Sequence, residues 1–204
     1  MIWPVYVITD PGAGLPVAEQ ALAAARGGAA LIQIRDKHAS DADLAALVAG
    51  LIPRVAALGA RLIVNDRVDV ALSTGAHGLH IGQGDGDAAA IRRRMPPGML
   101  LGLSIETVRQ ARGIPRGLVD YIGAGPVRAT ATKPDHAAPI GFDGLAAIIA
   151  EARLPTYAIG GIGPGDAAAV RAAGAAGLAV VSAVVRAVDP EAATAALVAE
   201  WGMA

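Results

Sequence analysis

One group of side chains has the chemistry to bind a diphosphate. Gln33, Arg35 and Lys37 occupy alternate positions of one segment, and Lys133 follows about a hundred residues later. Cationic side chains bind phosphate oxygens through charge-assisted hydrogen bonds, and this group offers more cationic donors than one monophosphate requires. Taken alone, Arg35 and Lys37 are equally typical of solvated surface charges.

Two carboxylates could hold a metal beside that group. Asp66 and Asp85 each follow a short apolar run. Magnesium is commonly held by one or two carboxylates together with phosphate oxygens of the substrate. We therefore predict Mg²⁺ as the cofactor, bound by Asp66 and Asp85. The alternative for Asn65-Asp66, taken alone, is a helix cap.

A second anion site is predicted near the C-terminal end of the sequence. Gly160-Gly161 and Val181-Ser182 each follow an apolar run, and backbone N–H groups at such positions can bind a phosphate with the help of a helix dipole. A tight turn is the alternative for Gly160-Gly161. Two phosphate-type pockets suggest two phosphorylated small-molecule substrates.

The elements that must position these residues are eight short runs that are mostly apolar at every position. Such runs are typical of strands covered on both faces. Alanine-rich segments that end in Gly-Ala, at Gly28, Gly59, Gly75 and Gly174, indicate a repeated helix–strand unit. The predicted strands are 5–9, 31–35, 62–66, 78–83, 100–104, 121–125, 156–160 and 177–182.

Strands that alternate with helices predict a parallel sheet, and eight units favour a single (β/α)₈ TIM barrel as one catalytic domain over residues 1–204. An open doubly wound sheet is the alternative. Catalytic groups of such barrels lie where the strands end, and all the residues singled out above lie at strand ends or in the loops that follow them. Ser104, which ends the fifth strand, could instead cap the helix that follows. The long connection from Pro126 to Phe142 is predicted to be a lid that carries Lys133.

Composition excludes several classes of protein. A net charge of −1 and only two Trp, three Tyr and one Phe do not fit a nucleic-acid-binding surface. The longest apolar-looking stretch, 172–185, contains two glycines and is too short to span a membrane. The chain has no cysteine, and its first residues lack a secretion signal, so we expect a cytoplasmic enzyme. The sequence is compatible with a homodimer.

At these residues the sequence resembles the thiamine phosphate synthase family over nearly its whole length. Any one of the matching motifs is weak, but five of them occur in order at the predicted strand ends. They are Gln33-x-Arg35-x-Lys37, Asn65-Asp66-Arg67-Val68-Asp69, Gly78-Leu79-His80-Ile81-Gly82-Gln83-x-Asp85, Gly125-Pro126-Val127-x-x-Thr130-x-Thr132-Lys133 and Ala158-Ile159-Gly160-Gly161-Ile162.

The resemblance implies a transferase of thiamine biosynthesis. Its reaction couples a hydroxymethylpyrimidine diphosphate with a hydroxyethylthiazole phosphate, in a dissociative displacement that releases diphosphate. Arg35, Lys37 and Lys133 would be catalytic, because they stabilise the departing diphosphate, and Asp66 and Asp85 would hold the magnesium. The implied pyrimidine-diphosphate-binding residues are Gln33, Arg35, Lys37, Asn65, Ser104 and Lys133, and the implied thiazole-phosphate-binding residues are Thr130, Ala131, Thr132, Gly161, Val181 and Ser182.

The sequence departs from the family pattern at three residues in two places. Arg128-Ala129 stands where an aromatic residue and a proline are usual, and Glu106 stands where a histidine is frequent. Three rival functions remain open. They are a thiazole tautomerase-like paralogue, a Schiff-base aldolase that uses Lys133 as its nucleophile, and a non-catalytic sensor of phosphorylated ligands.

Overall fold

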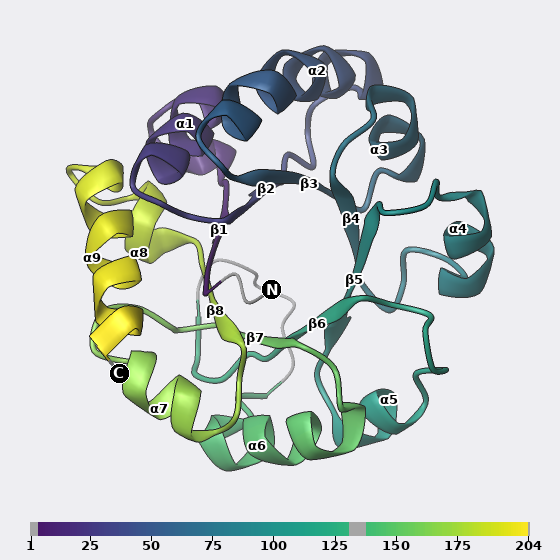
Figure 1. Ribbon diagram of the computed structural model, residues 1–204, viewed down its shortest axis with the longest axis vertical. Coiled ribbons are helices and arrows are strands. Elements are labelled where there is room, and N and C mark those ends of the chain that lie inside the picture. The colour runs from purple at the N-terminus through teal and green to yellow at the C-terminus, as the bar shows by residue number, and fades with distance from the viewer. Residues whose placement is uncertain (1–3, 131–137, 204) are drawn as a thin grey trace.

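Eight parallel strands close into one barrel, with helices around the outside (Figure 1). The computed structural model describes residues 4–130 and 138–203. Each strand pairs in parallel with its neighbours in sequence, and β1 pairs with β8 to close the barrel. The (β/α)₈ prediction is confirmed, and the alternative of an open sheet is wrong. The strands are β1 Val5–Ile8, β2 Leu31–Ile34, β3 Arg61–Asn65, β4 Gly78–Ile81, β5 Leu100–Ile105, β6 Tyr121–Ala124, β7 Thr156–Ile159 and β8 Gly177–Val180.

The helices of the described part of the chain form the outer layer. None of them is long and apolar enough to cross a membrane. They are the 3-10 helix η1 Pro11–Ala13 and the α-helices α1 Val17–Arg26, α2 Asp41–Ala57, α3 Val68–Thr74, α4 Ala88–Arg94, α5 Val108–Arg112, α6 Gly141–Ala152, α7 Ala167–Ala172, α8 Ser182–Val185 and α9 Pro190–Met203.

Most strands end before the polar residues that were assigned to them. β4 ends at Ile81 and not at Gln83, and β8 ends at Val180, so that Ser182 is the first residue of α8. β5 is the exception and continues to Ile105. The polar residues beyond these points lie outside the strands and line the cavity at the barrel mouth.

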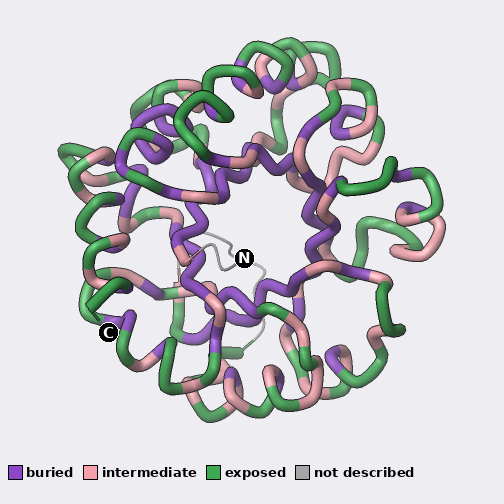
Figure 2. The backbone as a smooth tube through the Cα atoms, in the orientation of Figure 1, coloured by how far each residue is buried: buried purple, intermediate pink, exposed green. Residues whose placement is uncertain are grey.

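Two separate layers of apolar side chains result from the alternation along each strand. Val5 and Val7 point outward into the layer between strands and helices, whereas Tyr6 points into the barrel. Figure 2 shows the strands as a buried ring inside a more exposed circle of helices. Tyr6, Tyr121 and Tyr157 fill the barrel interior in edge-to-face contact, with ring centroids 5.4–5.9 Å apart. These rings form the floor beneath the mouth.

Local signals in the sequence explain how the helices begin and end. Gly28, Gly59, Gly75 and Gly174 all have φ between 69° and 92°, the left-handed conformation that glycine adopts without strain. The predicted repeat of helix, Gly-Ala and strand is thereby confirmed. Ser40 caps α2 by accepting a hydrogen bond from the backbone N–H of Asp43.

Candidate active site

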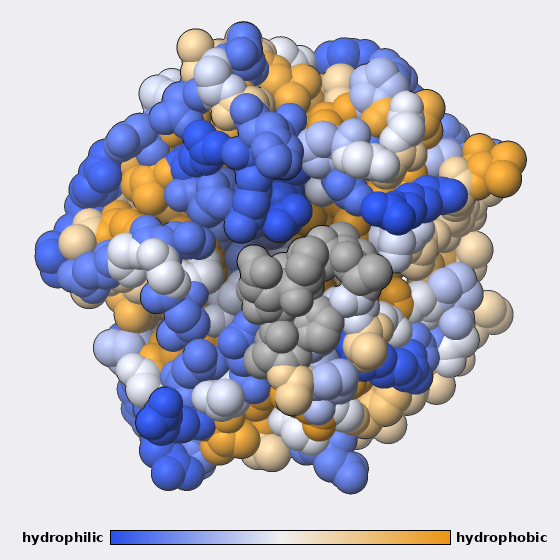
Figure 3. All heavy atoms as spheres, turned by 180° about the vertical axis from the view of Figure 1, so that it is seen from behind, coloured by the Kyte–Doolittle hydropathy of each residue, from blue (hydrophilic) through white to orange (hydrophobic). Residues whose placement is uncertain are grey.

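A cavity of about 450 Å³ opens at the end of the barrel where the strands end. From the side opposite to the view of Figure 1, hydrophilic side chains gather toward the centre of the molecule (Figure 3). Three of the predicted site residues, Ala131, Thr132 and Lys133, lie outside the described residues, and so does the middle of the predicted lid. The cavity brings together all the other predicted site residues: Gln33, Arg35, Lys37, Asn65, Asp66, Asp85, Ser104, Thr130, Gly161, Val181 and Ser182.

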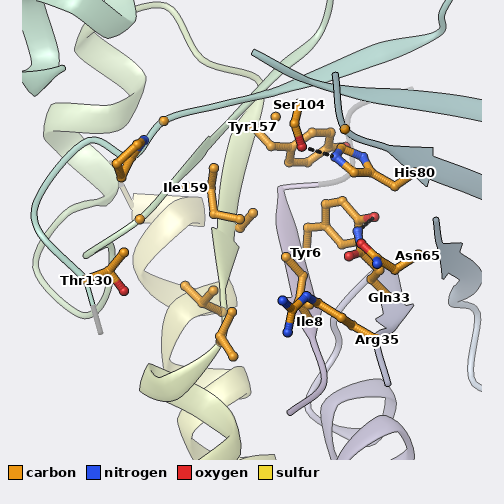
Figure 4. A pocket seen from close by; sticks show the side chains of 18 of the residues that line it. Tyr6, Ile8, Gln33, Arg35, Asn65, His80, Ser104, Thr130, Tyr157 and Ile159 are labelled. Carbon is orange, nitrogen blue, oxygen red and sulfur yellow. Dashed lines mark hydrogen bonds between the residues drawn. The ribbon is translucent and has the colours of Figure 1, made fainter. Parts of the chain in front are cut away.

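The end of β2 fixes the cationic side of the cavity. The hydroxyl of Thr9 donates to the carbonyl of Gln33 at 3.2 Å and accepts from the backbone N–H of Arg35 at 3.0 Å. This pair of bonds sets the direction in which the chain leaves the strand. Arg35 is half-buried at the rim and Lys37 is exposed. In Figure 4, Arg35 lies together with Gln33 and Asn65, and Thr130 lies on the opposite side of the cavity.

Asp66 lies close enough to Asp85 to be affected by its charge. Asp66 adopts a left-handed backbone conformation, with φ of 52°, and accepts a hydrogen bond from the Asn65 amide at 2.8 Å. Burial and, secondarily, the charge of Asp85 raise the pKa of Asp66, against the opposing charges of Arg67, Lys37 and Arg35. Asp85 accepts the backbone N–H of Gly82 at 2.7 Å. Two neighbouring carboxylates at the cavity rim fit a divalent cation.

The described residues contain no group of three or more His, Cys, Asp or Glu side chains that could hold a metal ion. A cation at Asp66 and Asp85 would therefore depend on oxygens from a ligand, which is how magnesium is commonly bound beside phosphates. The helix-cap alternative for Asn65-Asp66 is wrong. The N-cap of α3 is Arg67, and no side chain caps that helix.

The opposite side of the cavity offers backbone donors. Gly160 and Gly161 have φ of 91° and 66°, and α8 begins at Ser182. Within the described part of the chain, no hydrogen bond engages the backbone N–H groups of Gly161, Val181 and Ser182. Backbone donors are nearly always paired unless they face solvent or a ligand. These three N–H groups therefore suit an anion that enters the cavity.

Arg128 joins two of the loops that border this side. Its guanidinium donates to both carboxylate oxygens of Asp166, at 2.7 and 2.8 Å, and to the carbonyl of Gly161 at 3.1 Å. It also lies over the ring of Phe142, 5.0 Å from the centroid. Partial burial alone would raise the pKa of Asp166, but the hydrogen bonds from Arg128 and Gly163 lower it below its usual value. Arg128, which departs from the family pattern, thus has an ion-pair partner in Asp166.

Ser104 belongs to β5 and does not cap a helix. Thr107 is the N-cap of α5 and forms a capping box with Gln110, so the cap alternative for Ser104 is wrong. The Ser104 hydroxyl lies 3.0 Å from Nε2 of His80 (Figure 4).

Burial lowers the pKa of His80 to about 4, against the opposing charge of Asp85, so this imidazole is neutral near pH 7. Sequence patterns did not assign His80 a role, although it lies within one of the quoted motifs.

A closed (β/α)₈ barrel with a cavity lined by polar side chains at the ends of its strands is the arrangement of enzymes that act on small molecules. The thiamine monophosphate synthase family matches residues 5–184, and the chain belongs to that family. The predicted resemblance is confirmed.

Named relatives agree with the family. The chain is 48% identical over 198 residues to thiamine-phosphate synthase of Roseiflexus sp. (strain RS-1), which covers 95% of this chain and 83% of the relative. It is 47% identical over 193 residues to thiamine-phosphate synthase of Chloroflexus aurantiacus, with 94% and 89% covered. The solved structure of thiamine phosphate pyrophosphorylase from Pyrococcus furiosus superimposes with a TM-score of 0.90 at 33% identity, over 98% of this chain and 96% of that one.

Proposed function

We propose that this chain is a thiamine phosphate synthase, a transferase that couples a pyrimidinylmethyl diphosphate with hydroxyethylthiazole phosphate. One observation carries the proposal. A single cavity holds a cationic and amide group, two carboxylates, and a separate set of backbone donors on its far side. Two phosphorylated substrates could therefore bind at once with their reacting ends between the two sides.

The pyrimidine diphosphate is assigned to the side formed by β2, β3 and β5. Arg35 and Lys37 would bind the diphosphate oxygens, and they would stabilise the charge that develops as diphosphate departs. Buried Gln33, together with Asn65 and Ser104, would contact the pyrimidine end. Lys133 is assigned to the diphosphate from its motif alone.

The magnesium ion is assigned to Asp66 and Asp85, with diphosphate oxygens completing its ligands. When bound, the ion would offset negative charge on the leaving group. The hydrogen bond from Asn65 to Asp66 and the bond from Gly82 to Asp85 hold the two carboxylates in place before any ion arrives.

The thiazole phosphate is assigned to the backbone donors at Gly161, Val181 and Ser182, with Thr130 beside them and with Ala131 and Thr132 assigned from the motif. In the proposed reaction the methylene–oxygen bond of the pyrimidine substrate breaks, and its electron pair leaves with diphosphate. The thiazole nitrogen then gives its lone pair to the methylene cation, forming the carbon–nitrogen bond of thiamine phosphate. No proton transfer is needed, so the cavity requires no general base.

The rival functions are less well supported. A tautomerase needs neither a diphosphate pocket nor paired carboxylates at the rim. A Schiff-base aldolase needs a lysine in a dry pocket. Among the cavity-lining residues of the described part, the only lysine is Lys37, which is exposed. The proposed function is tested by incubating the protein with both substrates and Mg²⁺. Mass spectrometry should detect thiamine phosphate, and its absence would refute the proposal.

The contact between Arg128 and Asp166 is expected to keep the thiazole phosphate side in shape. Asp166→Asn removes the charge that holds Arg128 over Gly161. Because half of the Arg128 side chain is exposed, the pair should contribute about 1 kcal/mol, which corresponds to about a five-fold rise in the Kd of thiazole phosphate. Isothermal titration calorimetry with thiazole phosphate would measure this Kd. Glu151→Gln, which breaks the remote ion pair with Arg112, is the matched control, and equal effects from both variants would contradict the expectation.

A further inference from the structure

Five polar side chains form a continuous hydrogen-bonded chain through the barrel interior. The amide Nε2 of Gln33 lies 2.6 Å from the Tyr6 hydroxyl, which lies 3.0 Å from the hydroxyl of Tyr121. That second hydroxyl lies 3.2 Å from Nδ1 of His80, and Nε2 of His80 reaches Ser104. The two ends, Gln33 and Ser104, line the cavity. The middle three residues come from β1, β6 and β4.

The amide at one end favours one direction for the hydrogen bonds between these five side chains. The Nε2 of Gln33 can only donate, so the Tyr6 oxygen accepts at that contact. The arrangement that gives every hydrogen in the network an acceptor then points the single hydrogen of Tyr6 at Tyr121. The Tyr121 hydroxyl then gives its own hydrogen to Nδ1 of His80. A neutral imidazole that accepts at Nδ1 carries its hydrogen on Nε2 and donates it to the Ser104 oxygen.

We propose that this chain of bonds turns Ser104 into a hydrogen-bond donor toward the substrate. Because the Ser104 oxygen already accepts from His80, its own hydrogen is free to point at an acceptor atom of the pyrimidine diphosphate. Tyr6, Tyr121 and His80 are then positioning residues, which act through Ser104. This inference rests on the proposed function and adds to it the hydrogen-bonding role of one side chain.

Two glycines of the barrel leave room for the side chains of Tyr121 and His80 to come together. A Cβ atom at Gly102 would overlap both the Tyr121 ring and Nδ1 of His80. A Cβ at Gly123 would lie 3.4 Å from Cε1 of His80. Gly102 lies on β5, between the strands that carry His80 and Tyr121, and Gly123 lies on β6 together with Tyr121. The two glycines leave the space in which the imidazole and the phenol come together.

Nitrogen NMR of the ¹⁵N-labelled protein tests the direction without any substrate, since the two ring nitrogens of a neutral histidine differ strongly in shift. We expect wild-type His80 to carry its hydrogen on Nε2, and a His80→Asn variant assigns the signals among the four histidines. Tyr121→Phe should give a mixture of the two tautomers. An Nδ1–H tautomer in the wild type would overturn the inference.

Kinetics test the consequence for catalysis. Tyr121→Phe should lower kcat for thiamine phosphate formation on the order of ten-fold, as loss of an orienting partner typically does, and should leave KM for thiazole phosphate within about two-fold. Tyr157→Phe is the matched control, because Tyr157 packs on the same rings and its hydroxyl has no hydrogen bond within the described part of the chain.

Two outcomes separate this inference from the proposed function. Equal losses of kcat in the Tyr121→Phe and Tyr157→Phe variants would refute the role of Ser104 while leaving the function intact. A wild-type protein that makes no thiamine phosphate would refute the proposed function, and the NMR result would then decide the direction of the hydrogen bonds by itself.

Discussion

Asp85→Asn is expected to lower the rate of thiamine phosphate formation about 10²-fold, the size of effect seen when one group that stabilises transition-state charge is lost. The asparagine oxygen can still accept the backbone N–H of Gly82, which Asp85 accepts at 2.7 Å, so the loop keeps its shape and only the charge is removed. Asp66→Ala should cause a similar loss. The rate should be measured across a range of Mg²⁺ concentrations, and the concentration for half-maximal activity should rise in Asp85→Asn.

Asp87→Asn is the matched control, because Asp87 is an exposed acidic residue two positions away that caps α4 and does not line the cavity. It should keep wild-type activity and the same dependence on Mg²⁺. The assignment of the metal to Asp66 and Asp85 fails if the Asp85→Asn and Asp66→Ala proteins both stay fully active in the presence of a chelator.

Gly161→Val is expected to weaken binding of thiazole phosphate ten- to a hundred-fold, since hydrogen bonds to a charged group contribute about 1.5–3 kcal/mol. Gly161 has φ of 66°, and a Cβ there would lie 2.7 Å from Cβ of Arg128 and 3.1 Å from the carbonyl of Ala129. The substitution would therefore push the loop after β6 away from the backbone donors at Val181 and Ser182. Isothermal titration calorimetry without metal measures this affinity.

Gly165→Val separates the clash from backbone strain. Gly165 also has a positive φ, of 87°, but no atom lies within 4 Å of the position that a Cβ would take there, and the residue does not line the cavity. Both variants should lose stability from the strained backbone. Only Gly161→Val should lose affinity for thiazole phosphate, and unchanged affinity in that variant would place the anion site elsewhere.

Short-range patterns were sufficient to predict the barrel and most of its mouth. The apolar runs located the strands to within a few residues, and glycines such as Gly28 and Gly174 marked where helices end. In a closed parallel barrel all strand ends meet at one rim, so residues as distant as Arg35 and Ser182 could be placed together from their positions alone. Ser104 was ambiguous because serine suits both a strand end and a helix cap. In the structure, Thr107 and Gln110 form the capping box of α5, so Ser104 is not the cap.

Pairings that depend on closure of the barrel could not be predicted. Tyr6 and Tyr121 are 115 residues apart, and their hydroxyls meet only because alternate residues of β1 and β6 point to the same axis. Arg128 and Asp166 lie 38 residues apart on different loops, and nothing in the sequence near either one indicates the other. The unusual arginine at 128 was visible as a departure from the family pattern, but its partner was not.

Simultaneous measurement of diphosphate and thiamine phosphate in one reaction tests the central claim most directly. With both substrates and Mg²⁺ present, wild-type protein should release the two products in equal amounts, and Asp85→Asn should slow both together. Omitting thiazole phosphate should abolish formation of thiamine phosphate. Diphosphate release without matching thiamine phosphate in the complete reaction, or no release at all, would contradict the assignment of this cavity to the coupling reaction.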